Sequence, residues 1–136
     1  MTYSVILPNL LLGPALTPDV HAMLLEQVLP AIVCVAPQNE VPDYVTPLPT
    51  YRFPVSFMLP DDVSKQNIHA AVTKCIELIA SGHTVYLHCW QGVNRSAAVA
   101  VVVVEKVMHI SRAEAMAYVS MCRPAVDPKK HLAAFF

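Results

Sequence analysis

Residues 85–96 have the sequence VYLHCWQGVNRS, which contains the pattern HCxxGxxRS, where x is any residue. The apolar run Val85–Leu87 before the pattern is typical of a short buried strand. Gly92 permits a backbone turn that a β-carbon would hinder. A long apolar segment, Ala97–Met108, follows. The sequence therefore predicts a strand, a tight loop and a helix in direct succession.

The conformation of residues 97–108 is ambiguous from periodicity alone. Four consecutive valines, Val101–Val104, favour a strand, whereas the length of the segment favours a helix. We predict a helix, because the preceding loop can hold an anion only if a helix begins near Arg95. A helix that is apolar nearly all round is expected in the middle of the domain.

The loop has the features of an anion-binding site that carries a nucleophile. A loop wrapped at a helix N-terminus points its backbone N–H groups inward, and the helix dipole adds partial positive charge. The planar guanidinium of Arg95 can hold two oxygens of a phosphoryl group. An ordinary thiol with a pKa of about 8.5 is only roughly 3% thiolate at pH 7. At a helix N-terminus the pKa of Cys89 can fall to about 3.5–7.5, which makes the thiolate abundant.

These residue types predict a reaction in two steps. The Cys89 thiolate attacks phosphorus, a phosphocysteine forms, and water later releases phosphate. Ser96 is placed to donate a hydrogen bond to the sulfur as it leaves in the second step. His88 is expected to orient the loop through backbone hydrogen bonds.

The remaining elements predict an α/β fold. Apolar runs at 4–7, 10–12, 31–36 and 51–55 are expected strands, and helices are expected from Thr17 to Leu29, after Asp61 and Asp62, and from Ser111 to 121. Pro18 at a first helical position and Gly82 after a helix support these limits. We expect one domain, residues 1–136, with a central mixed or parallel sheet flanked by helices.

The sequence resembles dual-specificity protein phosphatases, a branch of the cysteine-dependent tyrosine phosphatases. The HCxxGxxRS pattern carries most of the resemblance, and residues 6–13 and the Arg123-Pro124 pair resemble further landmarks of the family. The resemblance implies the cysteine-dependent phosphatase fold and hydrolysis without a metal or other cofactor. It implies Cys89 as nucleophile, Arg95 as phosphate clamp and Ser96 as helper in hydrolysis. The backbone expected to make the other phosphate contacts is that of Trp90, Gln91, Gly92, Val93 and Asn94.

The chain departs from the family at the general acid. Such enzymes protonate the leaving oxygen with an Asp on a separate loop, and Phe57 stands at that position here, 32 residues before the nucleophile (89 − 57 = 32). Asp61 and Asp62 are the nearest carboxylates, and both are also suited to cap the following helix. Without an acid, ester cleavage is expected to favour aryl phosphates, because a phenolate with a pKa of about 10 leaves far more readily than an alkoxide.

Three functions remain open at this point. The first is a phosphatase acting on phosphotyrosine in proteins and more weakly on phosphoserine and phosphothreonine. The second is a phosphate-binding module with weakened turnover, which Phe57 leaves open. The third is an RNA 5′-triphosphatase, since Asn94 beside Arg95 resembles those enzymes. The loop adds no cation beyond Arg95, which disfavours inositol phospholipids.

Composition excludes several other classes. The chain has 136 residues, is 55% hydrophobic and 14% charged, and has a net charge of −1. These values exclude disorder and DNA binding through bulk charge. The apolar runs are too short for a membrane span, and the N-terminus has no secretory signal, so we expect an intracellular, cytoplasmic protein. No CxxC or CxxH pair and no His spacing indicates a metal site.

Overall fold

The computed structural model describes residues 2–57 and 61–136. Its strands are β1 (Ser4–Leu7), β2 (Leu10–Gly13), β3 (Ala31–Cys34), β4 (Thr50–Arg52) and β5 (Val85–His88). Its helices are α1 (Pro18–Gln27), α2 (Asp62–Ala80), α3 (Arg95–Met108), α4 (Arg112–Cys122) and α5 (Lys129–Phe135). The predicted α/β class is confirmed.

Within the described residues the strands form one five-stranded sheet in the order β1-β2-β5-β3-β4. β1 and β2 are antiparallel, and the other neighbouring pairs are parallel, so the predicted mixed sheet is confirmed. In the middle of the sheet, His88 at the end of β5 pairs with Gly13 of β2 on one side and Cys34 of β3 on the other. The residue after β5 therefore emerges where three parallel strands end, the edge at which open α/β sheets bind ligands.

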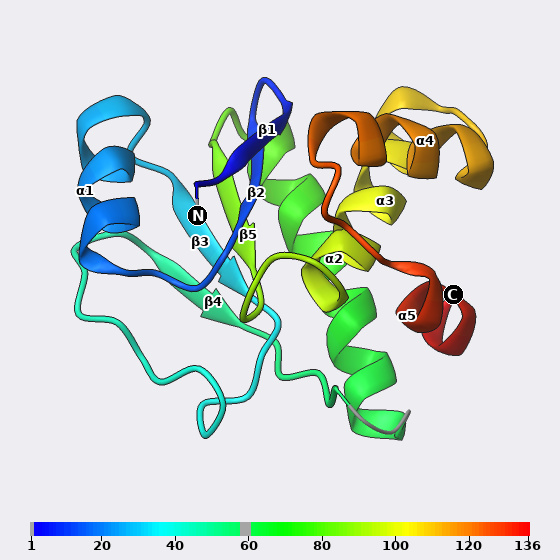
Figure 1. The fold of residues 1–136 in the computed structure, drawn as a ribbon, viewed down its shortest axis with the longest axis horizontal. Coiled ribbons are helices and arrows are strands. Elements are labelled where there is room, and N and C mark those ends of the chain that lie inside the picture. The colour runs from blue at the N-terminus through cyan, green and yellow to red at the C-terminus, as the bar shows by residue number, and fades with distance from the viewer. Residues whose placement is uncertain (1, 58–60) are drawn as a thin grey trace.

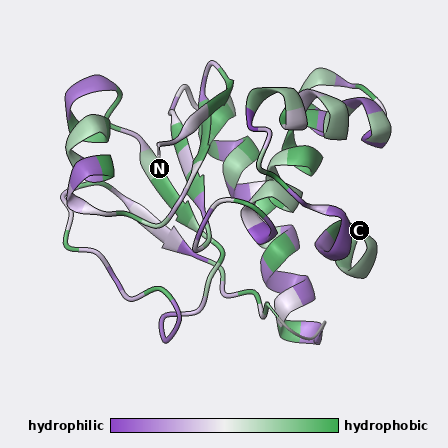
Figure 2. Cartoon of the chain, viewed as in Figure 1, coloured by the Kyte–Doolittle hydropathy of each residue, from purple (hydrophilic) through white to green (hydrophobic). Residues whose placement is uncertain are grey.

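Helices cover both faces of the sheet, with α1 on one face and α2 to α5 on the other (Figure 1). The smaller core beneath α1 consists of Leu11, Val20, Leu24, Ile32, Leu48 and Tyr86. The larger core surrounds α3, in which residues 95–104 are all buried. Figure 2 shows hydrophobic residues along the central strands and α3.

The helix predicted over residues 97–108 is confirmed, and α3 begins two residues earlier, at Arg95. Burial explains why a run of valines is helical here. Removing a valine side chain from water contributes roughly 1.5–3 kcal/mol. The helix propensity of valine is at most about 0.7 kcal/mol worse than that of alanine. Packing on all sides of α3 therefore outweighs the intrinsic preference for strand.

The predicted helix caps are present. Thr17 accepts a hydrogen bond from the backbone N–H of Val20, and Ser111 forms a capping box with Glu114. Gly82 follows α2 with a φ of 84°, a conformation that favours glycine. The prediction that the first helix continues to Leu29 is wrong, because α1 ends at Gln27. Leu29 has a φ of 45°, and Pro30 after it disfavours a helical conformation at this position.

Two predicted strands are too long. β3 ends at Cys34 rather than Ala36, and the strand predicted over residues 51–55 is Thr50–Arg52. The two segments still hydrogen-bond beyond these limits, since the N–H of Val55 donates to the carbonyl of Val35 over 3.2 Å. Pro54 has no N–H to continue the ladder, so the regular sheet ends there. No helix in the described part of the chain has both the length and the apolar character that a membrane crossing requires.

Candidate active site

The loop of residues 89–94 joins β5 to α3 and has all its carbonyl groups engaged in hydrogen bonds. The side-chain Nδ1 of His88 hydrogen-bonds the Cys89 carbonyl over 2.8 Å, and the N–H of Ala15 donates to the Trp90 carbonyl over 2.7 Å. The N–H of Asp127 donates to the Val93 carbonyl over 2.7 Å. The N–H of Ala98 donates to the Asn94 carbonyl within the first turn of α3. With these carbonyls engaged by other groups, the N–H groups of the loop are left to bind an anion, and that of Gly92 already hydrogen-bonds Cys89.

Arg123 engages the two remaining carbonyls of the loop. Its Nε donates to the carbonyl of Gly92 over 3.0 Å, and Nη2 donates to that of Gln91 over 3.1 Å. The side chain is buried, and Nη1 also bonds the carbonyl of Thr2 and the hydroxyl of Ser4. Arg123 therefore connects the loop to the N-terminal strand from behind. The sequence marked this position only as part of an Arg-Pro landmark and did not indicate its partners.

Gly92 is required by both its backbone conformation and its surroundings. It has a φ of 70°, and a β-carbon built there would lie within the contact distance of the Gly13 carbonyl carbon and oxygen at the end of β2. Any larger residue would push the loop away from the sheet. The predicted reason for glycine at this position agrees with this geometry.

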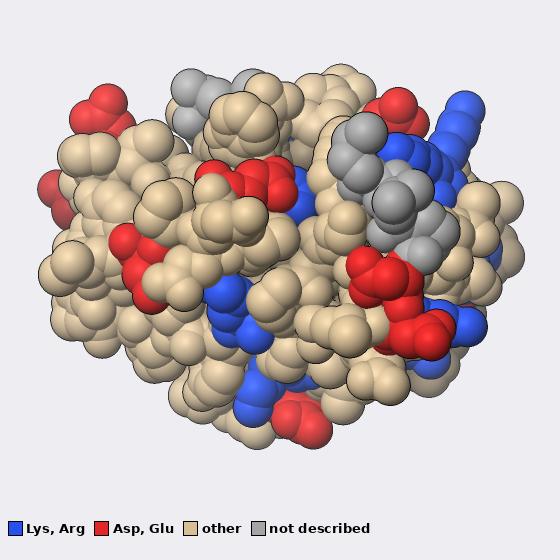
Figure 3. Space-filling model, turned by 90° about the horizontal axis from the view of Figure 1, so that it is seen from below, with Lys and Arg blue, Asp and Glu red and all other residues tan. Residues whose placement is uncertain are grey.

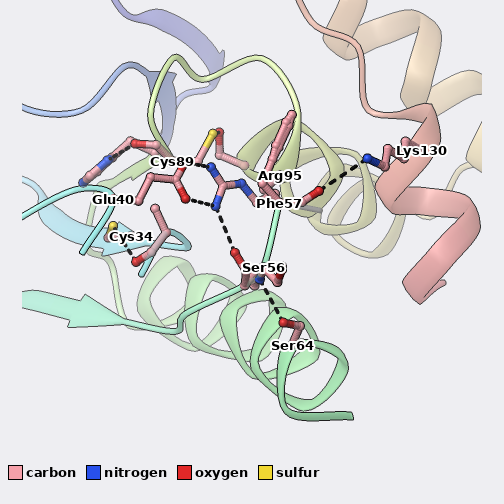
Figure 4. Close-up of polar contacts among 12 residues, drawn as sticks. Cys34, Glu40, Ser56, Phe57, Ser64, Cys89, Arg95 and Lys130 are labelled. Atoms are coloured by element: carbon pink, nitrogen blue, oxygen red, sulfur yellow. Dashed lines mark hydrogen bonds and ion pairs between the residues drawn. The ribbon is translucent and has the colours of Figure 1, made fainter. Parts of the chain in front are cut away.

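Cys89 is buried at the start of the loop, and its Sγ lies 3.1 Å from the hydroxyl oxygen of Ser96 (Figure 4). Burial acts to raise the pKa of the thiol. The Ser96 hydroxyl, the backbone N–H groups of Ser96 and Gly92, and the positive charge of Arg95 act in the opposite direction and outweigh it. The pKa of Cys89 is therefore lowered from its ordinary value, which favours the nucleophilic thiolate.

Arg95, the first residue of α3, is buried beside Cys89 and is held by Glu40 (Figure 4). Nη1 donates to one carboxylate oxygen of Glu40 over 3.0 Å, and Nη2 donates to the other. Nη1 also donates to the carbonyl of Val55 over 2.9 Å. Among the described residues, nothing accepts a hydrogen bond from Nε of Arg95. One side of the guanidinium is thus fixed by protein groups, and Nε is left for an oxygen of a bound phosphoryl group.

Glu40 is a site residue that the sequence analysis missed. It lies in the proline-punctuated loop between β3 and β4, 55 residues from Arg95 along the chain (95 − 40 = 55). No spacing or pattern connects the two positions. Glu40 lines the same depression as Cys89 and Arg95, and both its oxygens accept hydrogen bonds from Arg95. Its carboxylate therefore orients the guanidinium of Arg95.

The other predicted members of the loop lie around the entrance. Trp90 and Gln91 are exposed, and Val93 and Asn94 are half-buried. The side-chain amide of Asn94 donates to the carbonyl of Asp127 over 3.0 Å, which ties it to the segment before α5. None of these side chains adds positive charge near Arg95. On the face shown in Figure 3, acidic and basic side chains occur in small separate groups.

An aromatic residue, Phe57, occupies the position at which a general acid is expected. Phe57 lines the depression that contains Cys89 and Arg95. Asp61 and Asp62 instead line a neighbouring depression, together with Ser56 and Phe57. The Asp61 carboxylate accepts a hydrogen bond from the backbone N–H of Ser64 over 2.7 Å and caps α2. Asp61 is therefore engaged in helix capping, which was one of its two predicted roles.

We expect Asp61→Asn and Asp62→Asn to retain wild-type kcat/KM on an aryl phosphate to within about threefold. Neither carboxylate lies beside Cys89, and asparagine caps a helix about as well as aspartate. Steady-state rates for the two variants and the wild type provide the measurement. A thousandfold loss in either variant would identify that residue as the general acid, since losing such an acid costs about 10²–10⁴ in rate.

His88 is buried in the neutral form beneath the loop. Burial lowers its pKa to about 4, with a contribution in the same direction from the charge of Arg52, while the hydrogen bond to Cys89 acts in reverse. Its neighbours on the sheet are Gly13 and Cys34. The side chain supports the loop through the Cys89 carbonyl, as predicted.

The low pKa of His88 predicts a loss of stability in mild acid. Above about pH 6.5 the imidazole is neutral in both the folded and unfolded states. As the pH falls from there to about 4, the unfolded chain binds a proton that the native state excludes. The free energy of unfolding should then decrease by up to roughly 3 kcal/mol. Urea unfolding at pH 7, 6, 5 and 4.5 measures this slope, which should be shallower in His88→Asn; equal slopes would contradict the assignment.

No group of three or more His, Cys, Asp or Glu residues in the described part of the chain is arranged to hold a metal ion. The described cysteines are all free thiols. Cys34 and Cys75 are buried, as predicted, and burial raises the pKa of both. These properties distinguish them from Cys89, whose pKa is lowered.

The sequence matches no model of a known protein family and no curated protein. Solved structures match it over nearly the whole chain. Human DUSP28 is 23% identical with a TM-score of 0.79, covering 96% of this chain and 87% of that one. The human tyrosine phosphatase-like serine/threonine/tyrosine-interacting protein is 20% identical with a TM-score of 0.79, covering 93% and 87%. A mouse putative dual specificity phosphatase, solved with zinc tungstate, is 22% identical with a TM-score of 0.81, covering 97% and 82%. The chain has the dual-specificity phosphatase fold.

Proposed function

We propose that this protein is a phosphatase that works through a phosphocysteine intermediate, with residues 1–136 forming one catalytic domain. The observation that carries the proposal is the position of Cys89, at the start of a loop whose carbonyls are all engaged in hydrogen bonds, with Sγ 3.1 Å from the Ser96 hydroxyl and a lowered pKa. Arg95 lies beside it, and no residue that the structure describes accepts a hydrogen bond from its Nε. These groups are suited to bind the oxygens of a phosphoryl group and to attack its phosphorus.

In the first step the Cys89 thiolate forms a bond to phosphorus while the bond from phosphorus to the leaving oxygen breaks. The leaving group takes the electron pair of that bond, and backbone N–H groups and Arg95 hold the three remaining oxygens. In the second step water attacks the phosphocysteine, the sulfur leaves as a thiolate and inorganic phosphate is released. Ser96, 3.1 Å from Sγ, donates a hydrogen bond to the departing sulfur.

The substrate we propose is phosphotyrosine in proteins, with weaker activity on phosphoserine and phosphothreonine. Phe57 supplies no proton to the leaving oxygen, so we expect rates to depend on how stable the leaving anion is. A phenolate is far more stable than a serine or threonine alkoxide. A reduced cysteine is needed for the reaction, which suits the cytoplasm, where thiols are kept reduced.

The test compares three substrates side by side, with Cys89→Ser as the blank. They are a phosphotyrosine peptide, a phosphothreonine peptide and an RNA with a 5′-triphosphate end. The proposal expects the fastest turnover of the phosphotyrosine peptide. Preferential release of the γ-phosphate from RNA would favour a triphosphatase instead. Equal background from wild type and blank on all three would leave a phosphate-binding module.

A further inference from the structure

Phe57 forms one wall of the depression that contains Cys89, and Trp90 lines the same depression. Phe57 is 37% exposed and Trp90 is 60% exposed. The centre of the Phe57 ring lies 5.3 Å from Cζ of Arg95. Figure 4 shows the ring beside the Arg95 side chain, with Lys130 on the far side. A leaving group attached to a phosphoryl group at Cys89 would therefore emerge next to an exposed aromatic surface.

Contacts from α5 and α2 hold Phe57 and its neighbour Ser56. Its carbonyl accepts a hydrogen bond from Nζ of Lys130 over 3.4 Å, and that Nζ also lies 5.1 Å from the ring centre. The ring of His131 packs against it with the centres 5.8 Å apart. The backbone N–H of the preceding Ser56 donates to the hydroxyl of Ser64 over 2.8 Å. The wall is thus held in place before a substrate binds.

An aromatic wall at this place has two chemical consequences. A phenyl ring has no proton to donate, so residue 57 cannot protonate the leaving oxygen. The ring also offers an apolar face to whatever carries that oxygen, and aromatic groups gain from offset or edge contacts with such a face. A phenol satisfies both conditions, whereas the short alkyl side chains of serine and threonine satisfy neither.

We infer that Phe57 is a specificity-determining residue that selects aryl phosphates, above all phosphotyrosine, over alkyl phosphates. It does so by packing against the aromatic leaving group and by occupying the place of a proton donor. The inference rests on the proposed function for the reaction itself. Its binding component is independent of turnover and is tested separately.

The binding test uses proteins that carry Cys89→Ser, so that no phosphate is released during the measurement. Calorimetry with matched phosphotyrosine and phosphothreonine peptides compares this variant with the double variant that also carries Phe57→Leu. We expect Phe57→Leu to weaken phosphotyrosine binding about 3- to 10-fold and to leave phosphothreonine binding unchanged. Equal weakening of both peptides, or of neither, would overturn the packing role.

The kinetic test uses Phe57→Asp with Phe57→Asn as its matched control. An aspartate in this place can donate a proton to an alkoxide, and an asparagine of the same shape cannot. We expect Phe57→Asp to raise kcat/KM on the phosphothreonine peptide about 10²-fold over Phe57→Asn, with activity declining as the new carboxyl loses its proton. Equal rates for the two variants would show that a proton donor at residue 57 does not govern specificity.

Two further measurements distinguish a wrong inference about Phe57 from a misfolded variant or a protein without phosphatase activity. Binding of inorganic tungstate by every Phe57 variant reports that the loop around Cys89 is intact. Wild-type activity no greater than that of Cys89→Ser would refute the proposed phosphatase function, and the binding comparison would still decide the packing role of Phe57.

Discussion

Cys89→Ser is expected to lower kcat/KM for an aryl phosphate by at least about 10⁵-fold, because removing a nucleophile costs an enzyme most of its acceleration. A serine hydroxyl stays protonated under conditions that ionise the Cys89 thiol, whose pKa is lowered by Ser96, Gly92 and Arg95 against the effect of burial. None of these neighbours is a base that would remove the serine proton.

The same variant should still bind phosphate or tungstate, because the N–H groups of residues 90–94 belong to the backbone and Arg95 is unchanged. Rates measured with an aryl phosphate, together with calorimetric binding of tungstate, check both parts. Cys122→Ser is the matched control, since Cys122 is a free cysteine of α4 that does not line the depression containing Cys89, and it should retain activity within twofold. A Cys89→Ser protein with a few per cent of wild-type activity would refute the phosphocysteine intermediate.

The second large effect is expected for Arg95→Lys, which should lower kcat/KM by about 10³-fold. Removing one donor to a developing oxyanion costs about 10²–10³, and a lysine cannot both bind the two oxygens of Glu40 and present a donor in the place of Nε. Lysine would also leave Glu40 facing a single ammonium in place of two guanidinium N–H groups. The charge is conserved in this substitution, so the loss reports the fork geometry.

Arg112→Lys is the matched control for this prediction. Arg112 also pairs with a carboxylate, that of Glu105, but on the partly exposed surface of α3 and α4. It should retain activity within about twofold. Steady-state kinetics on one aryl phosphate with both variants provides the comparison. A loss in Arg95→Lys of less than tenfold would show that the guanidinium does not clamp the transferred group.

Much of the fold was predictable because its determinants are local. Apolar runs, the capping residues Thr17 and Ser111, and Gly82 after a helix each act within a few residues along the chain. The loop of residues 89–94 was predictable for the same reason, since a strand, a turn glycine and a helix start follow one another directly. The limits of β3 and β4 were not, because they depend on which residues of two distant segments pair and on where Pro54 interrupts that pairing.

The parts of the site that lie outside this loop follow from contacts between distant segments. Glu40 meets Arg95 across 55 residues, and Arg123 meets Gly92 across 31. Neither pair can be predicted from spacing or periodicity in the sequence, because the residues come together only when the sheet edge packs against α3 and α4. From the sequence, Phe57 is recognisable only as the residue that stands where related enzymes have the aspartate of the general acid.

The local order of residues 85–96 thus specifies the nucleophile, the turn and the first residue of the helix, because strand, loop and helix dipole act on neighbours along the chain. The orientation of Arg95, the hydrogen bonds of the loop carbonyls and the position of Phe57 depend on partners from other segments of the chain. These properties arise only when the folded sheet and its helices bring those segments to one edge of the sheet. Burial there strengthens each hydrogen bond and each interaction between charges.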